Sequence, residues 1–414
     1  MTKIKAFKAH RPKVGLEEKI ASRPYDVLNS EEAKIEAAGN NYSFLRINKP
    51  EIDLPKGTDH YSKEVYNKGK ENLDEFINNN WLVQDDGPRL YIYEQTMGKH
   101  KQKGLVAGSA IDDYFNDVIK KHEHTRFQKE TDRIEHMATL SAHIGPVFLT
   151  YKPVKQLDQI IEDWCENTDS VYDFVSEDEI GHKVWVIDKQ VTIDTITCIF
   201  ETQIPFTYVA DGHHRSAASA KVGAMLRDQK GEYTGKEEFN HFLSVLFPSN
   251  QLMIIDYNRL IKDLNGLSKE AFLTALQTNF TVEKQNGEVR PSMNYEYGMY
   301  LDGDWYKLKA DDSITGIIDP VKKLDISILS DYIIDPILGI ADQRTSNRID
   351  FVGGIRGLGE LQKRVDSGEM LVAFSIHPVE IDQLIDVADS GNVMPPKSTW
   401  FEPKLRSGLF VHNF

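Results

Sequence analysis

The segment Tyr208-Val209-Ala210-Asp211-Gly212-His213-His214-Arg215 is the most informative part of this sequence. The residues before it, from Ile204 to Val209, are mainly apolar and β-branched, and the residues after it, from Ser216 to Met225, are rich in alanine. β-Branched residues favour strands and alanine favours helices. The pattern therefore predicts a tight strand-to-helix turn at residues 211–214, with Arg215 in the first turn of the helix.

A turn of this kind is typical of a phosphate site. The first amides of a helix have no partner within the helix, and the helix dipole is positive there, so the turn attracts anions. Gly212, His213, His214 and Arg215 supply donors, and an arginine can hold a phosphate through two parallel hydrogen bonds. Asp211 would cap the helix, bind a metal or accept a proton. The alternative for any single histidine is a purely structural bond to nearby backbone.

Composition and charge exclude several classes of protein. At 414 residues the chain exceeds the size at which one core stops growing, so we expect more than one domain. A formal net charge of −15 argues against a nucleic-acid binder and against an anionic membrane surface. The absence of a signal-peptide core, of any run of about 18 apolar residues and of a disulfide framework (only Cys165 and Cys198) predicts a cytoplasmic protein.

The order of elements predicts an α+β protein in three parts. Residues 1–117 form a mixed α/β N-terminal segment, residues 118–260 a phosphate-binding core, and residues 261–414 a C-terminal α/β lobe. Within these parts we expect strands at 183–187 and 190–200, and a hairpin around Asp302-Gly303.

A second motif, His122-Glu123-His124-Thr125, precedes an expected helix. The two histidines are two residues apart, which is poor spacing for a zinc site. A carboxylate flanked by imidazoles is better suited to accept a proton, so Glu123 is a candidate general base. A solvated charge cluster beside the helix is the alternative.

Other candidate residues lie far away in the chain. Asp26 follows an aromatic residue and precedes a helix, so it either faces a pocket or is a solvated or helix-capping carboxylate. The segment from Met394 to Lys404 contains Lys397 and Lys404, which could contact phosphate as point charges. Alternatively, its aromatic residues only anchor the terminus.

Known enzyme signatures are mostly absent. The chain has no Gly-x-Ser-x-Gly nucleophile elbow, no phosphate loop of the Gly-x-x-x-x-Gly-Lys-Ser/Thr type and no protein-kinase motifs. Phosphoryl transfer remains compatible with the sequence. It needs mainly hydrogen-bond donors placed around the transferred group, usually Mg²⁺, and a carboxylate that takes the proton of the acceptor hydroxyl. The turn supplies the donors, and Glu123 or Asp211 could be the base.

Three motifs, taken together, resemble a known fold. His122-Glu123, Gly145-Pro146-Val147 and the turn at 211–215 are similar to the ParB/sulfiredoxin-like fold, and most closely to its free-serine kinase branch. The resemblance implies a core of this fold over residues 118–260 and phosphoryl transfer from ATP or ADP, with Mg²⁺, to free L-serine. Nearly the whole chain also resembles a domain-of-unknown-function family, through motifs at 23–27, 122–125, 211–215 and 394–401.

The resemblance also implies roles for residues. Glu123 matches the base that acts on the substrate hydroxyl, and Asp211 matches the aspartate of the phosphate turn. His213 stands where sulfiredoxins have a cysteine, so that chemistry is excluded. The remaining candidates are Gly212, His213, His214, Arg215 and Thr125 for the phosphates, and Asp26, His122, Arg133, Lys397, Ser398, Thr399 and Lys404 for the substrate.

Two further functions stay open at this point. One is a nucleotide-binding switch or partner-binding module, in which the turn holds a nucleotide with little chemistry. The other is a nucleotide hydrolase with water as the acceptor. The identity of the metal ligands and the oligomeric state, including a homo-oligomer, also stay open.

Overall fold

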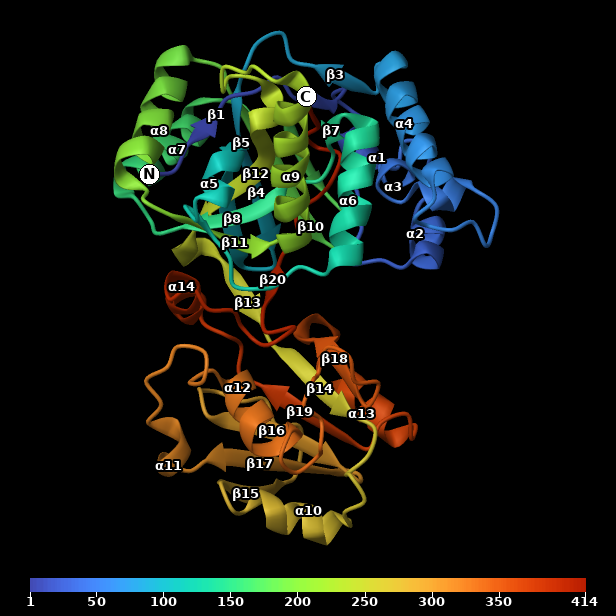
Figure 1. The fold of residues 1–414 in the computed structure, drawn as a ribbon, viewed down its shortest axis with the longest axis vertical. Helices are drawn as coiled ribbons and strands as arrows, with labels where there is room; N and C mark the ends of the chain where they lie inside the picture. The colour runs from blue at the N-terminus through green and yellow to red at the C-terminus, as the bar shows by residue number, and fades with distance from the viewer. The chain divides into compact units, whose positions relative to one another are not determined.

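The computed structural model describes residues 1–414, which form two compact units. The first unit contains Met1–Leu252 together with Pro403–Phe414, and the second contains Met253–Glu402. Figure 1 shows the elements of both units. The three predicted parts are not separate in this grouping, because strands from both sides of residue 117 enter one sheet and the last twelve residues belong to the first unit.

A nine-stranded mixed sheet is the centre of the first unit. Its order is β6-β11-β8-β12-β5-β4-β10-β9, and β1 pairs with β5. The pairs β6–β11 and β8–β12 are parallel, and the other pairs are antiparallel. The strands are β1 (Ile4–Lys5), β4 (Leu90–Met97), β5 (His100–Ala110), β6 (Ile119–Lys120), β8 (Val147–Tyr151), β9 (Tyr172–Val175), β10 (Ile180–Ile187), β11 (Thr207–Asp211) and β12 (His241–Pro248).

Two small pairings tie the chain ends to this unit. β2 (His10–Pro12) pairs with β3 (Leu82–Gln84), and β21 (His412–Asn413) pairs with β7 (Ala142–His143). A further bridge joins Ser22 to Ser407. These contacts fix the last residues of the chain among elements from its first 150 residues.

Helices surround the sheet. The helices are α1 (Glu17–Ile20), α2 (Ser30–Glu36), α3 (Leu45–Asn48), α4 (Lys63–Asn78), α5 (Ile111–Phe115), α6 (Phe127–Leu140), α7 (Lys155–Asn167), α8 (Gln190–Gln203) and α9 (His213–Lys230). Helices α6 and α9 lie side by side (Figure 1). Helices α7 and α8 instead pack their apolar residues into the main core. That core combines strand residues with Leu157, Ile161, Trp164, Ile193, Ile196, Ile199 and Phe200 of the two helices.

The prediction of a strand at residues 190–200 is wrong, because these residues belong to helix α8. Ile193, Ile196, Ile199 and Phe200 are the buried residues of this helix. Their spacing of three and four places them on one helical face. The β-branched content suggested a strand, but the period of the buried residues is helical.

The second unit contains a six-stranded antiparallel sheet in the order β15-β17-β16-β19-β14-β18. The hairpin expected at Asp302-Gly303 is confirmed as β16–β17, and Asp302 has a positive φ of 53°. A separate pair joins β13 to β20. The elements are β13 (Met253–Ile255), β14 (Tyr257–Ile261), β15 (Phe280–Gln285), β16 (Glu296–Leu301), β17 (Asp304–Ala310), β18 (Ile349–Gly353), β19 (Val372–Ile376), β20 (Trp400–Glu402), α10 (Lys269–Leu276), α11 (Asp312–Thr315), α12 (Asp325–Leu329), α13 (Leu358–Asp366) and α14 (Ile381–Asp389).

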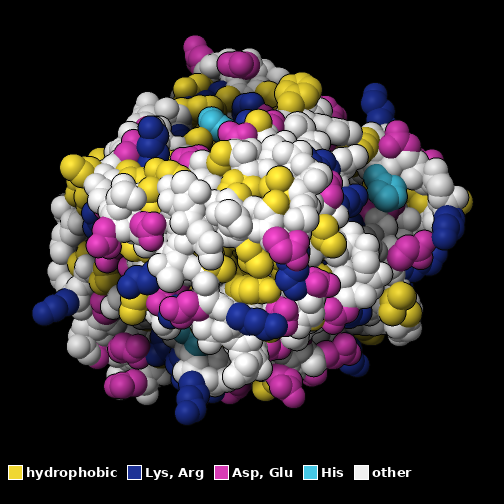
Figure 2. Space-filling view, turned by 90° about the horizontal axis from the view of Figure 1, so that it is seen from below, with side chains coloured by type: hydrophobic (Ala, Val, Ile, Leu, Met, Phe, Trp, Pro, Cys, Tyr) yellow, Lys and Arg dark blue, Asp and Glu magenta, His cyan; other side chains and the backbone are white.

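The predicted α+β class is therefore confirmed. No helix is long and apolar enough to cross a membrane. On the face of the molecule in Figure 2, acidic and basic side chains are interspersed, with no broad area of a single charge.

Candidate functional site

The parallel pairing of β6 and β11 brings the two sequence motifs together. In this pairing Ile119 is opposite Thr207, and Lys120 is opposite Tyr208. Because the strands run in the same direction, the loop after β6 and the turn after β11 leave the sheet at the same edge. The His122–Arg126 loop therefore lies beside the turn at 211–215.

Three contacts join the loop to the turn. The His122 and His213 rings meet edge to face, with centroids 4.4 Å apart. The Glu123 Oε2 atom is 3.8 Å from His213 Nδ1, and the Arg126 amide donates to His214 Nε2 over 3.0 Å. The pair of motifs predicted from the sequence is thus one spatial cluster.

Gly212 gives the turn its shape. Its φ is +92°, a left-handed conformation that a residue with a Cβ adopts only with strain. A Cβ at this position would lie 3.1 Å from Arg215 Nε. Helix α9 begins directly afterwards at His213, and no side chain caps its N-terminus. The N-cap residue therefore offers no side-chain acceptor to the first amides of α9.

Arg215 is buried at the centre of the cluster. Its Nη1 atom donates to the Pro146 carbonyl over 2.6 Å. Its Nη2 atom lies 3.5 Å from Asp211 Oδ2 and 3.9 Å from Asp26 Oδ2. Burial alone would lower the pKa of Arg215, but Asp26 and Asp211 outweigh burial and raise it. The guanidinium is charged, yet its Nε atom has no protein partner.

Asp211 is held as a carboxylate by two cations. Lys404 Nζ lies 3.6 Å from Asp211 Oδ2, and Arg215 approaches the same oxygen. Burial would raise the pKa of Asp211, but Lys404 and then Arg215 outweigh burial and lower it. The C-terminal lysine therefore brings a further positive charge to the turn.

Two histidines of the cluster, His122 and His213, are neutral. Burial lowers the pKa of His122 to about 4. Burial, followed by the neighbouring His122 ring, lowers the pKa of His213 well below its ordinary value. The contact between His213 and Glu123 is therefore not an ion pair. The buried Nε2 atom of His213 has no protein partner.

A polar cavity of about 230 Å³ lies beyond Asp26, whose Oδ2 atom is 3.9 Å from Arg215 Nη2. Asp26 belongs to its lining and also faces Arg215. Helix α6, which follows the His122–Arg126 loop, forms one wall through Lys129, Asp132, Arg133 and His136. These residues are spaced by three and four, so they share one face of the helix.

Arg133 is fixed at this wall from two sides. Its Nη2 atom donates to Asp132 Oδ2 over 2.6 Å, and its guanidinium lies over the Tyr25 ring, 4.1 Å from the centroid. Two candidates that are far apart in the sequence, Asp26 and Arg133, therefore line one cavity.

The other candidates have different surroundings. The Thr125 hydroxyl donates to Glu130 Oε2 over 2.8 Å, so its proton is already used. Lys397, Ser398 and Thr399 belong to the second unit, where the Ser398 hydroxyl donates to the Pro395 carbonyl and Lys397 Nζ lies 5.7 Å from the centroid of the Tyr257 ring. Their contact with substrate stays a prediction.

The site also contains residues to which the sequence analysis gave no role of their own. The carbonyl of Pro146 anchors Arg215, and Tyr25 supports Arg133. Ser407 lies close to Gly145: a Cβ atom added to this glycine would be 3.4 Å from the Ser407 hydroxyl. The Gly145-Pro146 dipeptide was a usable signal, since it marks a turn beside a buried strand. Tyr25 belongs to the motif at 23–27, whereas nothing local marks Ser407.

No group of three or more His, Cys, Asp or Glu side chains in the structure is placed to hold a metal ion. Mg²⁺ does not require such a group, since it is usually held by one or two carboxylates together with substrate phosphates. Asp211 and Glu123 are the carboxylates beside the turn that suit this mode.

The sequence also identifies a family. Residues 4–327 match the family model described as protein of unknown function (DUF1015). The chain belongs to this family. No curated protein matches its sequence.

Several solved structures resemble this DUF1015 protein at low sequence identity. A free serine kinase in complex with AMP has a TM-score of 0.33 and 12% identity, covering 72% of this chain and 86% of that one. SbnI with a C-terminal truncation, from Staphylococcus aureus, has a TM-score of 0.38 and 10% identity, covering 73% and 85%. A conserved hypothetical protein from Pyrococcus furiosus has a TM-score of 0.34 and 13% identity, covering 73% and 93%.

Proposed function

We propose that this protein is a small-molecule kinase that transfers a phosphoryl group from ATP or ADP to the hydroxyl of free L-serine. The observation that carries the proposal is a pair of buried polar atoms without protein partners, His213 Nε2 and Arg215 Nε, at the uncapped start of α9. Buried polar atoms in proteins are nearly always hydrogen-bonded, so two orphans at one anion-attracting turn indicate a ligand.

The phosphates of the donor nucleotide would bind at this turn. The first amides of α9 and the Arg215 guanidinium supply hydrogen-bond donors, and Lys404 supplies a second positive charge. Asp211 lies against both cations and keeps them at the turn. Mg²⁺ bound with the nucleotide would neutralise phosphate charge and orient the transferred group.

Glu123 is the proposed general base. Its side chain is 39% exposed, so an incoming hydroxyl can reach it. The neighbouring His213 is neutral and does not compete as an ion-pair partner. As the serine oxygen forms its bond to phosphorus and the bond to the leaving nucleotide oxygen breaks, the hydroxyl proton passes to the Glu123 carboxylate.

The cavity beyond Asp26 is the proposed acceptor site. Asp26 offers a carboxylate for the ammonium group of an amino acid, and Arg133 offers a guanidinium for its carboxylate. The Nη1 atom of Arg133 has no protein acceptor, because its hydrogen bonds come from Nε and Nη2. Among the amino acids with a hydroxyl group, we choose serine because the motifs resemble those of the free-serine kinase branch.

Phosphorus NMR tests the proposal directly. The purified protein is incubated with Mg²⁺ and ATP or ADP in the presence of L-serine, and the spectrum is followed for a new phosphomonoester signal. We expect O-phosphoserine, and we expect Glu123→Gln to slow its formation by about 10²-fold or more, as for loss of a general base. Glu135→Gln, an exposed carboxylate on α6, is the matched control.

Other outcomes distinguish the alternatives. Release of inorganic phosphate without a phosphomonoester, with serine present, would indicate a nucleotide hydrolase. Tight nucleotide binding without turnover would indicate a switch or binding module. An unchanged rate of transfer in Glu123→Gln would remove Glu123 from the role of base.

A further inference from the structure

The first unit contains a second, larger cavity of about 430 Å³. This volume falls within the range of small-molecule sites, about 300–1,000 Å³. The cavity is distinct from the turn at 211–215, because none of its lining residues belongs to the site described above. Its lining is polar throughout apart from Ala21 and consists of Glu18, Lys19, Ala21, Ser22, Arg23, Glu36, Asn40, Ser43, Ser176, Glu177, Asp178 and Arg406.

Arg406 is buried in the wall of this cavity, with one edge of its guanidinium fixed. Its Nε atom donates to His182 Nε2 over 3.3 Å. Its Nη2 atom donates to the Ser176 hydroxyl over 3.0 Å and also to Asp178. The structure gives Nη1 no protein acceptor. Three contacts therefore hold the guanidinium in place while one terminal nitrogen remains available.

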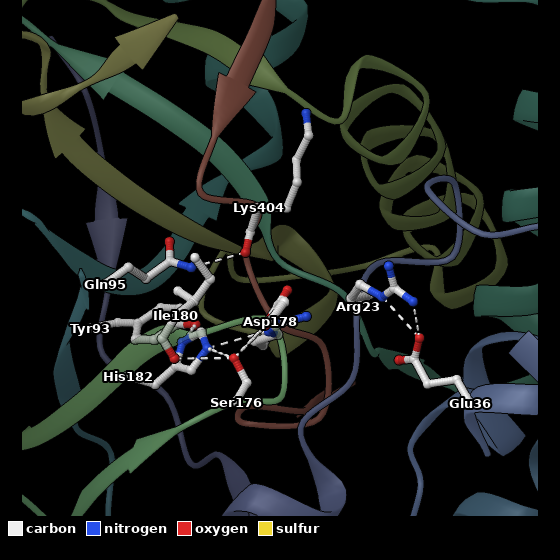
Figure 3. Close-up of polar contacts among 10 residues, drawn as sticks. Arg23, Glu36, Tyr93, Gln95, Ser176, Asp178, Ile180, His182 and Lys404 are labelled. Carbon is white, nitrogen blue, oxygen red and sulfur yellow. Dashed lines mark hydrogen bonds and ion pairs between the residues drawn. The ribbon is translucent and has the colours of Figure 1, made fainter. Parts of the chain in front are cut away.

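His182 supports this arrangement from below (Figure 3). Its Nδ1 atom is 2.8 Å from the Tyr93 hydroxyl, and its Nε2 atom also meets the Ser176 hydroxyl over 3.0 Å. Burial, followed by Arg406, lowers the pKa of His182 to about 3, so the ring is neutral and can accept from the guanidinium. Figure 3 shows Tyr93, His182, Ser176 and Asp178 gathered in one cluster, with the Lys404 side chain pointing away from it.

A second guanidinium in the cavity has the same pattern. Arg23 donates from Nε and Nη2 to Glu36, and its Nη1 has no protein acceptor. In Figure 3 the pair of Arg23 and Glu36 lies apart from the cluster of Ser176 and Asp178. Arg23 and Arg406 thus each have one edge clamped by a carboxylate and one terminal nitrogen left over, which is a pre-formed arrangement for a carboxylate or phosphate.

The cavity also contains carboxylates that lack an ion-pair partner. Glu36 and Asp178 are used by the two arginines, but Glu18 and Glu177 form no salt bridge in the structure. Beside the two arginines the lining has one more cation, Lys19, so a ligand with negative charge alone would leave at least one of these two carboxylates uncompensated. A ligand that also carries an ammonium group would pair with these carboxylates as well as with the two arginines.

We propose that this cavity is a second ligand site, for a small zwitterionic metabolite that carries a carboxylate or phosphate together with an ammonium group. The acidic end binds the free Nη1 atoms of Arg23 and Arg406, and the ammonium binds Glu18 and Glu177. The lining has no aromatic residue, so the ligand is recognised by charge and hydrogen bonds and not by ring stacking. Binding here is independent of the proposed kinase reaction.

Isothermal titration calorimetry on the full chain tests the site. The probes are L-aspartate, L-glutamate and O-phospho-L-serine, and succinate serves as the matched probe because it is L-aspartate without the ammonium group. We expect at least one of the three amino probes to bind with one-to-one stoichiometry. If L-aspartate binds, its affinity should exceed that of succinate by about tenfold or more. A crystal structure with the bound probe should show it between Arg23 and Arg406.

Two variants make the test specific. Arg23→Gln should weaken probe binding by about tenfold or more, because it removes one of the two available guanidiniums. Arg89→Gln, which removes another partly exposed, salt-bridged arginine of the same unit, should leave binding unchanged. Arg406→Lys provides a second measurement, checked for folding by its melting temperature.

The inference would be overturned by any of three results. One is that none of the three amino probes binds. Another is that Arg23→Gln and a folded Arg406→Lys both bind as tightly as the wild type. The third is a bound probe that lies at the turn of residues 211–215 instead of in the cavity.

Discussion

Two buried arginines, Arg215 in the first unit and Arg259 in the second, occupy opposite electrostatic surroundings. Arg215 faces two carboxylates at 3.5 and 3.9 Å, and these raise its pKa. Arg259 has only backbone carbonyls as acceptors, those of Tyr257 and Pro396, and burial lowers its pKa to about 9. Each has an Nε atom without a protein partner.

The difference shows that burial of an arginine is not by itself a sign of a binding site. Arg259 lies over the Phe351 ring, 4.8 Å from its centroid, and holds the 394–402 segment through Pro396. Arg215 instead lies beside a glycine turn and the uncapped start of a helix, and it faces Asp26, which lines a polar cavity. We therefore assign Arg215 to ligand binding and Arg259 to the structure of its own unit.

The largest expected effect is on nucleotide binding. Arg215→Ala should weaken the affinity for ATP or ADP by about 2–4 kcal/mol, as when a buried charged contact is truncated. Equilibrium titration measures this, with Arg227→Ala as the control because Arg227 is on the same helix but forms its ion pair with Asp112. If a folded Arg215→Ala variant bound the nucleotide as tightly as the wild type, Arg215 would not belong to the site. It would then be a structural residue, like Arg259.

The second prediction concerns the neutral histidines beside Arg215. The folded pKa of His122, about 4, is below the ordinary value of 6.5, so between these values the unfolded chain binds more protons than the folded one. Stability therefore rises with pH across this window, by up to about 1.4 kcal/mol per pH unit for one group. His122→Asn should reduce this slope in denaturant titrations at pH 4–6.5. An unchanged slope would mean that His122 is charged in the folded protein.

The third prediction tests the structural role of Arg259. Arg259→Gln should lower hydrogen-exchange protection within residues 394–402 by about fivefold, because one hydrogen bond contributes roughly 1 kcal/mol and Pro396 would lose its donor. Nucleotide affinity should stay the same. A clear loss of affinity would instead support the predicted contact of Lys397, Ser398 and Thr399 with substrate.

The smallest effect is expected at Thr125. Its hydroxyl proton is donated to Glu130, so Thr125→Val should change nucleotide affinity by less than about 0.5 kcal/mol. The same titration measures it beside Arg215→Ala. A loss comparable to that of Arg215→Ala would show that Thr125 leaves Glu130 to bind phosphate, as the sequence alone suggests.

The sequence allowed correct prediction where the signal is local. The turn at residues 211–214 follows from a β-branched approach, a glycine and an alanine-rich run, and the hairpin at Asp302-Gly303 follows from its turn residues. The prediction failed at residues 190–200, because residue type favoured a strand while the spacing of the buried isoleucines is helical. Tertiary packing of that apolar face decides the outcome.

The sequence by itself determined the chemistry of the turn. It specifies the hydrogen-bond donors of the turn, and it places a glycine that allows these donors to follow the strand directly. Only the tertiary structure decided which distant charges meet them. Asp26 and Lys404 are nearly the full chain length apart, yet both lie within 4 Å of the Asp211–Arg215 pair, at 3.9 and 3.6 Å. Such contacts depend on sheet register and on the return of the last twelve residues to the first unit, and neither leaves a trace in local residue patterns.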